Sequence, residues 1–209
     1  MPRRNIRVGI IDYAASNLRS VEKAFAYLGA STFVSSCREE LDNADALIFP
    51  GQGSNDAAMQ ALKKASLVEP IVNFVKNERP FLGICMGLQL LMENSEEGSE
   101  PCLGLFDGSV KRLSGKMKIP HIGWNQVLRK KKHQVFDDLP DKPYFYFVHS
   151  YYADPVDKNL VLATTDYGKT FCSAIATGNL IAVQFHPEKS GEIGLNLYRN
   201  FLEFARERS

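Results

Sequence analysis

The sequence lacks an excess of charge of either sign. Its 25 Lys and Arg residues are balanced by 24 Asp and Glu residues, so the chain as a whole has no electrostatic preference for nucleic acid or acidic membranes. It also lacks an apolar run of membrane-spanning length and the apolar core of a secretory signal. We therefore expect a soluble, cytoplasmic protein that binds neither nucleic acid nor membrane.

Cysteine and histidine are scarce, with 4 of each in 209 residues. They form no CxxC or Cys/His cluster of the kind that holds zinc, and a chain of this size builds a core without disulfides. We predict one domain over residues 1–209, with no metal and no cofactor. The one dense basic run, residues 129–133, is interpreted as a solvated loop, with an anion site as the alternative.

The first half of the chain alternates strands and helices, which indicates a parallel sheet with helices on both faces. Strands are predicted at residues 6–11, 32–34, 46–49 and 81–84, and helices at residues 18–28, around Met59 and Leu62 with Asn55 as N-cap, and at 71–76. The second half reads as strands at 106–113, 121–128, 144–152, 160–165, 171–177 and 180–185, with hairpins at 166–169 and 177–179, before a helix at 195–204. The predicted fold class is α/β, with a mostly parallel central sheet flanked by helices and additional antiparallel strands in the second half.

Cys85 lies in the sequence Gly-Ile-Cys-Met-Gly, between an apolar strand and an apolar stretch over 88–92 predicted as a helix. This is the nucleophile-elbow pattern with cysteine in the serine position. Gly83 and Gly87 fit because side chains at such a tight turn would collide with the neighbouring strand and helix. A helix N-terminus at this place would favour the thiolate.

His186 and Glu188 are the base and the orienting carboxylate that such a nucleophile needs. In an extended segment they would project to the same side. Taken alone, His-x-Glu also suits an ordinary strand end, but its combination with the cysteine elbow favours catalysis. His149 is a possible second base for which a hydrogen-bonded core or interface role fits better, and Cys102 is expected to be structural.

Acyl transfer also requires hydrogen-bond donors for the developing oxyanion. The Pro-Gly-Gln-Gly turn at residues 50–53 follows a buried strand, so we expect it at the same sheet edge as the elbow. The backbone amides of Gln52 and Met86 are the predicted donors. A phosphate cradle is the alternative, and the absence of GxGxxG and of a Walker lysine disfavours it.

These motifs closely resemble those of class I (triad-type) glutamine amidotransferases, which have a flavodoxin-like fold. The His-Ile-Gly-Trp-Asn stretch at 121–125 and the Tyr-Phe-Tyr-Phe-Val-His-Ser-Tyr stretch at 144–151 are similar to those of the glutaminase subunits of imidazole glycerol phosphate synthases. The resemblance extends from residue 6 to residue 204. It implies a glutaminase that forms a heterodimer with a partner cyclase, to which it passes ammonia for histidine biosynthesis.

The resemblance also assigns roles by position. It implies that Cys85, His186 and Glu188 are catalytic and that substrate glutamine is bound by residues that line its pocket: Gly53, Gln89, Glu97, Ser150 and Tyr151. Glu96 is an alternative to Glu97. It places four residues toward the partner cyclase: Asn17, Trp124, Tyr146 and Lys189.

The chain departs from the family pattern at two places. Residues 12–17 read Asp-Tyr-Ala-Ala-Ser-Asn where many relatives carry glycines, and Gln52 replaces a common valine in the oxyanion turn. Three alternatives remain: a paralogous glutaminase that supplies ammonia to another acceptor such as a nucleotide sugar, an inactive allosteric scaffold, and a hydrolase or stress protein with a cysteine elbow.

Overall fold

The computed structural model describes residues 6–14 and 17–208. An eight-stranded sheet has the order β2-β1-β3-β4-β13-β12-β11-β8. Its members are β1 Arg7–Ile11, β2 Ser31–Ser35, β3 Ala46–Gly51, β4 Phe81–Cys85, β8 Leu128–Arg129, β11 Val161–Asp166, β12 Thr170–Thr177 and β13 Leu180–Val183. Along this order, the pairings from β2 through β1, β3 and β4 to β13 are parallel. The pairings from β13 through β12 and β11 to β8 are antiparallel. The predicted fold class is therefore confirmed, with the strand order of flavodoxin-like sheets in its parallel part.

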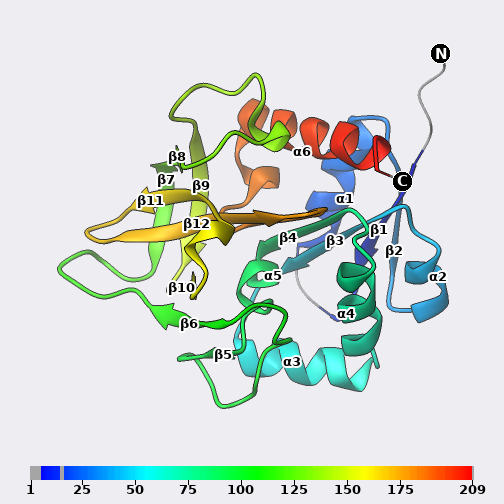
Figure 1. Cartoon of the computed structure of the whole chain (residues 1–209), viewed down its shortest axis with the longest axis horizontal. Helices are drawn as coiled ribbons and strands as arrows, with labels where there is room; N and C mark the ends of the chain where they lie inside the picture. Colours follow the sequence, from blue (N-terminus) through cyan, green and yellow to red (C-terminus); the bar gives the residue numbers. More distant parts are fainter. Residues whose placement is uncertain (1–5, 15–16, 209) are drawn as a thin grey trace.

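Helices cover both faces of the parallel strands (Figure 1). Helices α1 Leu18–Tyr27 and α6 Gly191–Arg206 pack their apolar side chains into one core layer. The other layer receives α2 Arg38–Asp42, α3 Asn55–Lys64, α4 Val68–Lys76 and the short α5 Met86–Gln89. The strands between them are buried on both faces, which explains their nearly continuous apolar sequences.

Two smaller sheets stand beside the parallel strands. Strands β5 Asn94–Ser95, β6 Gly108–Arg112 and β10 Tyr151–Pro155 form one, while β7 His121–Gln126 and β9 Tyr144–His149 pair antiparallel in the other. The predicted strands at 121–128 and 144–152 are each divided in two, at Val127 and at Ser150. Because of these divisions, β8 joins the eight-stranded sheet and β10 the three-stranded sheet, while β7 and β9 pair with each other. The hairpins at 166–169 and 177–179 are confirmed.

Three local predictions were wrong. Asn55 is the first residue of α3 and not its cap; Ser54 holds that position, and the Asn55 amide donates instead to the Glu100 carbonyl oxygen at 2.9 Å. The helix predicted over 88–92 is the four-residue α5, which ends at Gln89. The final helix is longer than predicted, because Gly191 lets it start close to the preceding turn.

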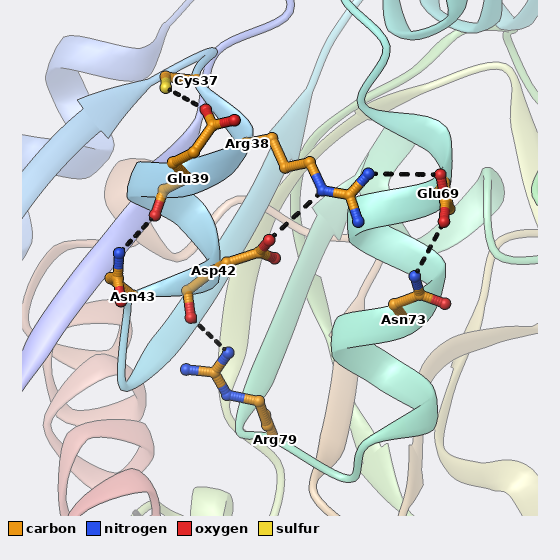
Figure 2. A network of polar contacts seen from close by, with 8 residues as sticks. All are labelled: Cys37, Arg38, Glu39, Asp42, Asn43, Glu69, Asn73 and Arg79. Carbon is orange, nitrogen blue, oxygen red and sulfur yellow. Dashed lines mark hydrogen bonds and ion pairs between the residues drawn. The ribbon is translucent and has the colours of Figure 1, made fainter.

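A surface network of polar contacts joins α2 to α4 (Figure 2). Arg38 lies 3.5 Å from Asp42 and 3.4 Å from Glu69, and Arg79 donates to the Asp42 carbonyl oxygen. Such exposed pairs contribute little stability individually. No helix in the described ranges is long and apolar enough to cross a membrane.

Candidate active site

Cys85 lies at a sharp turn between β4 and α5. Its backbone has φ 56° and ψ −106°, a conformation that costs energy for any residue with a side chain. A Cβ at Gly83 would lie 2.8 Å from the Gly87 carbonyl oxygen, and one at Gly87 would collide with the Phe49 carbonyl oxygen. The steric reason predicted for these two glycines is confirmed, and the turn has the geometry of a nucleophile elbow.

The environment of the sulfur differs from the prediction. Helix α5 has only four residues, so its dipole at Cys85 is small. A different donor lies beside the thiol, because Gln184 Nε2 is 3.6 Å from Cys85 Sγ. Gln184 was not among the predicted site residues. Its position two residues before His186 was the available signal.

His186 and Glu188 lie together as predicted, with His186 Nδ1 2.8 Å from Glu188 Oε1. The extended segment assumed for them was wrong: β13 ends at Val183, and Glu188 lies in the 3₁₀ turn Pro187–Lys189. Glu188 also accepts hydrogen bonds from Asn17 Nδ2 at 2.6 Å and from the Tyr198 hydroxyl at 3.2 Å. Three donors therefore fix the carboxylate that orients the imidazole.

The second ring nitrogen of His186, Nε2, is buried and makes no hydrogen bond of good geometry to the described residues. Burial lowers the pKa of His186, but the Cys85 sulfur and the Glu188 carboxylate outweigh it and raise the pKa to about 10. This electrostatic environment favours the imidazolium form of His186. Nε2 is thus the atom free to exchange a proton with the reacting groups.

A cavity of about 340 Å³ opens beside the elbow. It brings together most of the predicted site residues: Gln52, Gly53, Cys85, Met86, Gln89, Glu97, Ser150, Tyr151 and Lys189. Pro120, Val148 and His149 also line it and were not predicted to do so. A second, narrow cavity adjoins Gln52, His186, Glu188 and Asn17.

The turn at Gln52 reaches the nucleophile through strand pairing. Strands β3 and β4 are parallel, and their register places Gly51 opposite Cys85. A Cβ at Gly51 would lie 2.7 Å from the Met86 Cβ, so the two segments approach closely. Both predicted oxyanion donors, the backbone amides of Gln52 and Met86, therefore belong to residues that border the cavity beside the sulfur.

The structure distinguishes the two neighbouring glutamates. Glu97 is half-buried, lines the cavity and accepts a hydrogen bond from the Asn55 backbone at 2.8 Å. Burial raises its pKa. Glu96 is exposed and turned away, with its carboxylate 2.8 Å from the Arg112 backbone nitrogen. The geometry favours Glu97 as the acidic group of this cavity.

Of the residues predicted to face a partner, Trp124 on β7 lies opposite Tyr146 on β9. Trp124 is 55% exposed and packs edge-on against Tyr146 at 6.3 Å between ring centroids. Lys189 lies over the Tyr146 ring, and Asn17 contacts Glu188 of the triad. Ile122 at 59% and Tyr144 at 51% extend this exposed apolar patch, which is of the kind that marks interaction sites. Residues 15 and 16, part of the unusual segment 12–17, lie outside the described residues.

Cys102, Cys172 and His149 are buried, whereas Cys37 is exposed. Burial raises the pKa of the Cys102 thiol to about 11 and that of Cys172 to about 12, so both stay protonated near neutral pH. Cys102 donates to Asn55 Oδ1 at 2.9 Å, in agreement with the structural role predicted for it. His149 is buried and hydrogen-bonded, as expected for a core role. The described residues contain no cluster of metal-ligating side chains.

Comparisons with known proteins agree with this geometry. Residues 9–204 match the family model described as glutamine amidotransferase class-I, and the chain belongs to this family of enzymes. It is 46% identical over 199 residues to the imidazole glycerol phosphate synthase subunit HisH of Dehalococcoides mccartyi strain CBDB1, covering 95% of this chain and 97% of that protein. It is 48% identical over 204 residues to the HisH protein of Thermosynechococcus vestitus, covering 96% and 98%.

Solved structures support the fold. A putative GMP synthase protein from Thermoplasma acidophilum is similar with a TM-score of 0.75 at 20% identity, over 98% of this chain and 96% of that one. A glutaminase domain of CTPS from Trypanosoma brucei, with bound acivicin, is similar with a TM-score of 0.67 at 17% identity, over 98% and 95%.

Proposed function

We propose that this chain hydrolyses glutamine to glutamate and ammonia and supplies the ammonia to the cyclase subunit of an imidazole glycerol phosphate synthase, in histidine biosynthesis. The observation that carries the chemistry is the strained Cys85 with a buried His186–Glu188 pair beside a cavity of about 340 Å³. The near full-length similarity to synthase subunits supports the choice of acceptor.

In the proposed mechanism the Cys85 sulfur attacks the side-chain amide carbon of glutamine. The negative charge that develops on the amide oxygen is stabilised by the backbone amides of Gln52 and Met86. The carbon–nitrogen bond breaks as His186 protonates the leaving nitrogen, which gives ammonia and a thioester. His186 then removes a proton from water, whose oxygen attacks the thioester and releases glutamate.

The amino-acid end of the substrate would bind farther along the cavity. The Glu97 carboxylate is the group for the substrate ammonium, and Gly53, Ser150 and Tyr151 form the surrounding walls. The Gln89 side-chain nitrogen already donates to Tyr151 O at 2.8 Å and to Gln184 at 3.0 Å. Its carbonyl oxygen is therefore the part able to accept from the substrate.

The proposed partner surface consists of Asn17, Trp124, Tyr146 and Lys189, on a single-domain chain that forms a heterodimer in the cytoplasm. Ser190 connects this surface to the base, because its hydroxyl accepts from Tyr146 N at 3.0 Å and donates to His186 O at 2.6 Å. Tyr146 O also accepts directly from His186 N at 2.9 Å, so a partner that contacts β9 would touch a strand that is hydrogen-bonded to the backbone of His186.

The principal alternative is a paralogue that delivers ammonia to another acceptor, such as a nucleotide sugar. The chemistry at Cys85 is common to both, so only the acceptor enzyme distinguishes them. An inactive scaffold is disfavoured, because the His186–Glu188 contact is intact and Cys85 has the strained backbone of an elbow.

The test combines the purified chain with a partner cyclase and measures glutamate release with and without the cyclase substrate. We expect a low basal rate that rises strongly in the complex with ligand. Cys85→Ser should abolish the release, whereas the matched Cys102→Ser variant should retain it. Full hydrolysis by Cys85→Ser would refute the assignment of Cys85 as the nucleophile. Activation only by a different acceptor enzyme would show that the chain is the paralogous glutaminase.

A further inference from the structure

The carbonyl oxygen of Tyr151 accepts two hydrogen bonds at the wall of the cavity. One comes from His149 Nδ1 and the other from Gln89 Nε2, both at 2.8 Å. A carbonyl oxygen only accepts, so it fixes the direction of both bonds. His149 must carry its proton on Nδ1, and Gln89 must turn its amide nitrogen toward Tyr151.

The branch through His149 leads outward to β7. Burial lowers the pKa of His149 to about 3 and that of His121 to about 4, so both rings are neutral and each has one donor and one acceptor nitrogen. Since His149 Nδ1 donates, its Nε2 accepts from His121 Nδ1 at 2.9 Å. His121 Nε2 then accepts from Asn125 Nδ2 at 3.3 Å.

The branch through Gln89 leads inward to the nucleophile. Gln89 Nε2 also donates to Gln184 Oε1, at 3.0 Å. With its oxygen held there, the fully buried Gln184 directs its nitrogen at Cys85 Sγ, 3.6 Å away. A hydrogen bond donated to sulfur stabilises the thiolate relative to the thiol.

We propose that Asn125, His121, His149, Gln89 and Gln184 form a single hydrogen-bond chain, with its polarity set by Tyr151 O, that holds an N–H donor on the Cys85 sulfur and connects it to β7. Gln184 contacts the reacting atom, whereas His121 and His149 are positioning residues. The proposal deepens the proposed function and rests on Cys85 as the nucleophile.

Strand β7 gives this chain an outer end on the proposed partner surface. Its residues alternate between the two faces: His121 and Asn125 join the chain, while Ile122 and Trp124 are 59% and 55% exposed. A partner that shifts β7 would therefore change the His121–His149 contact. This makes the chain a physical route between the patch and the sulfur.

Other ionisable groups face the sulfur and must be held constant in a test. His186 lies on one side with Glu188 behind it. The Tyr13 hydroxyl lies on another; its oxygen is buried without a hydrogen-bond partner in the described structure, and burial together with Cys85 raises its pKa. Substitutions at His121 or Gln184 leave both of these groups in place.

The experiment measures the rate of Cys85 alkylation by iodoacetamide against pH, read by peptide mass spectrometry in a Cys37→Ser background that removes the exposed thiol. His121→Leu removes the donor to His149, and His121→Asn retains an N–H near the position of Nδ1. We expect His121→Leu to raise the midpoint of the pH profile by about 1 unit. His121→Asn should restore most of this shift, and Gln184→Met should raise the midpoint at least as much as His121→Leu.

The double variant His121→Leu/Gln184→Met should show no more than the Gln184→Met shift, because both changes interrupt the same chain. Equal effects of Leu and Asn at position 121, additive shifts in the double variant, or an unmoved midpoint in Gln184→Met would each overturn the proposal. If His121→Leu does not fold, as judged by circular dichroism, the Gln184→Met profile decides alone. No glutamine or partner is needed, so a failure of the proposed function is measured separately.

Discussion

His186 Nδ1 lies 2.8 Å from Glu188 Oε1 across a 3₁₀ turn, and both side chains are almost completely buried. The carboxylate can only accept from this nitrogen, so it holds the proton on Nδ1 and leaves Nε2 for the reaction. Within this turn Glu188 also accepts hydrogen bonds from Asn17 and Tyr198.

Glu188→Gln should lower kcat for glutamine hydrolysis in the activated complex by about 100-fold or more, because an amide favours the wrong tautomer and no longer stabilises the imidazolium. Tyr198→Phe is the matched control, since it removes only the contact to Oε2, and we expect a loss of less than about 10-fold. Steady-state kinetics of glutamate release check both. Equal kcat values for Glu188→Gln and the unchanged chain would contradict the assigned role.

Gly87→Ala should destabilise the protein by about 3 kcal/mol and remove activity, because its Cβ would collide with the Phe49 carbonyl oxygen on β3. Gly29→Asn is the control: Gly29 has φ 76°, no atom lies within 4 Å of its Cβ position, and asparagine tolerates this conformation. Urea unfolding gives both free energies. A fully stable Gly87→Ala protein would show that the elbow can relax.

These glycines also show what the sequence determines. A nucleophile between a strand and an apolar stretch requires a tight turn. The tightness of that turn was enough to explain why glycine is needed at both positions, Gly83 and Gly87. The same local pattern did not determine the length of α5, because tertiary contacts, such as Leu91 O accepting from Leu105 N at 3.0 Å and Phe106 N at 3.0 Å, replace the helix there.

The residues that sequence reasoning missed depend on non-local pairing. His121 meets His149 only because the register of β7 and β9 places them opposite each other. Gln184 reaches Cys85 only because β13 lies parallel to β4. Neither register follows from a motif, since strand pairing between distant segments is set by the whole fold. The elbow at Cys85 and the His186–Glu188 pair were predictable because their residues belong to motifs, and the network around them was not.

Stability should fall as pH decreases from 6.5 to 5, because His121 and His149 are neutral in the folded state. Burial lowers the pKa of both rings below the value of about 6.5 in the unfolded chain, so the unfolded state binds more protons in this range. Each such ring contributes a slope of up to about 1.4 kcal/mol per pH unit. The stability is fully present above pH 6.5 and declines below it.

His121→Asn should reduce the slope of stability against pH by up to about 1.4 kcal/mol per pH unit, because asparagine does not titrate. Urea unfolding of both proteins at several pH values between 5 and 7.5 measures the difference. Titrating groups other than His149, which contacts His121, are common to the two proteins and should cancel. Parallel curves would mean that His121 is already protonated in the folded protein.

Trp124→Ala should weaken binding to the partner cyclase by about 2 kcal/mol, because exposed tryptophans at interfaces contribute strongly when they become buried. Tyr27→Ala is the matched control: Tyr27 is 77% exposed and is the last residue of α1, which precedes the edge strand β2. Isothermal titration calorimetry should show an unchanged Kd for Tyr27→Ala. If only Tyr27→Ala weakens binding, the partner does not bind at the surface around Trp124, and the proposed partner surface is wrong.

Glu97→Gln should raise KM for glutamine by about 10-fold or more with a smaller effect on kcat, because it removes the charge that would pair with the substrate ammonium. The glutamine oxygen can still accept from the Asn55 backbone, so the local structure should persist. Glu96→Gln provides the comparison in the adjacent position, where the carboxylate is exposed and faces Arg112 N. Its KM should stay within about 2-fold of the unchanged chain, as expected for a surface charge. Each variant removes one negative charge, and the two positions are adjacent. A difference in KM between them therefore separates the effect of the contact in the cavity from a general electrostatic effect. If Glu96→Gln raises KM and Glu97→Gln does not, the substrate ammonium binds outside the cavity wall that contains Glu97.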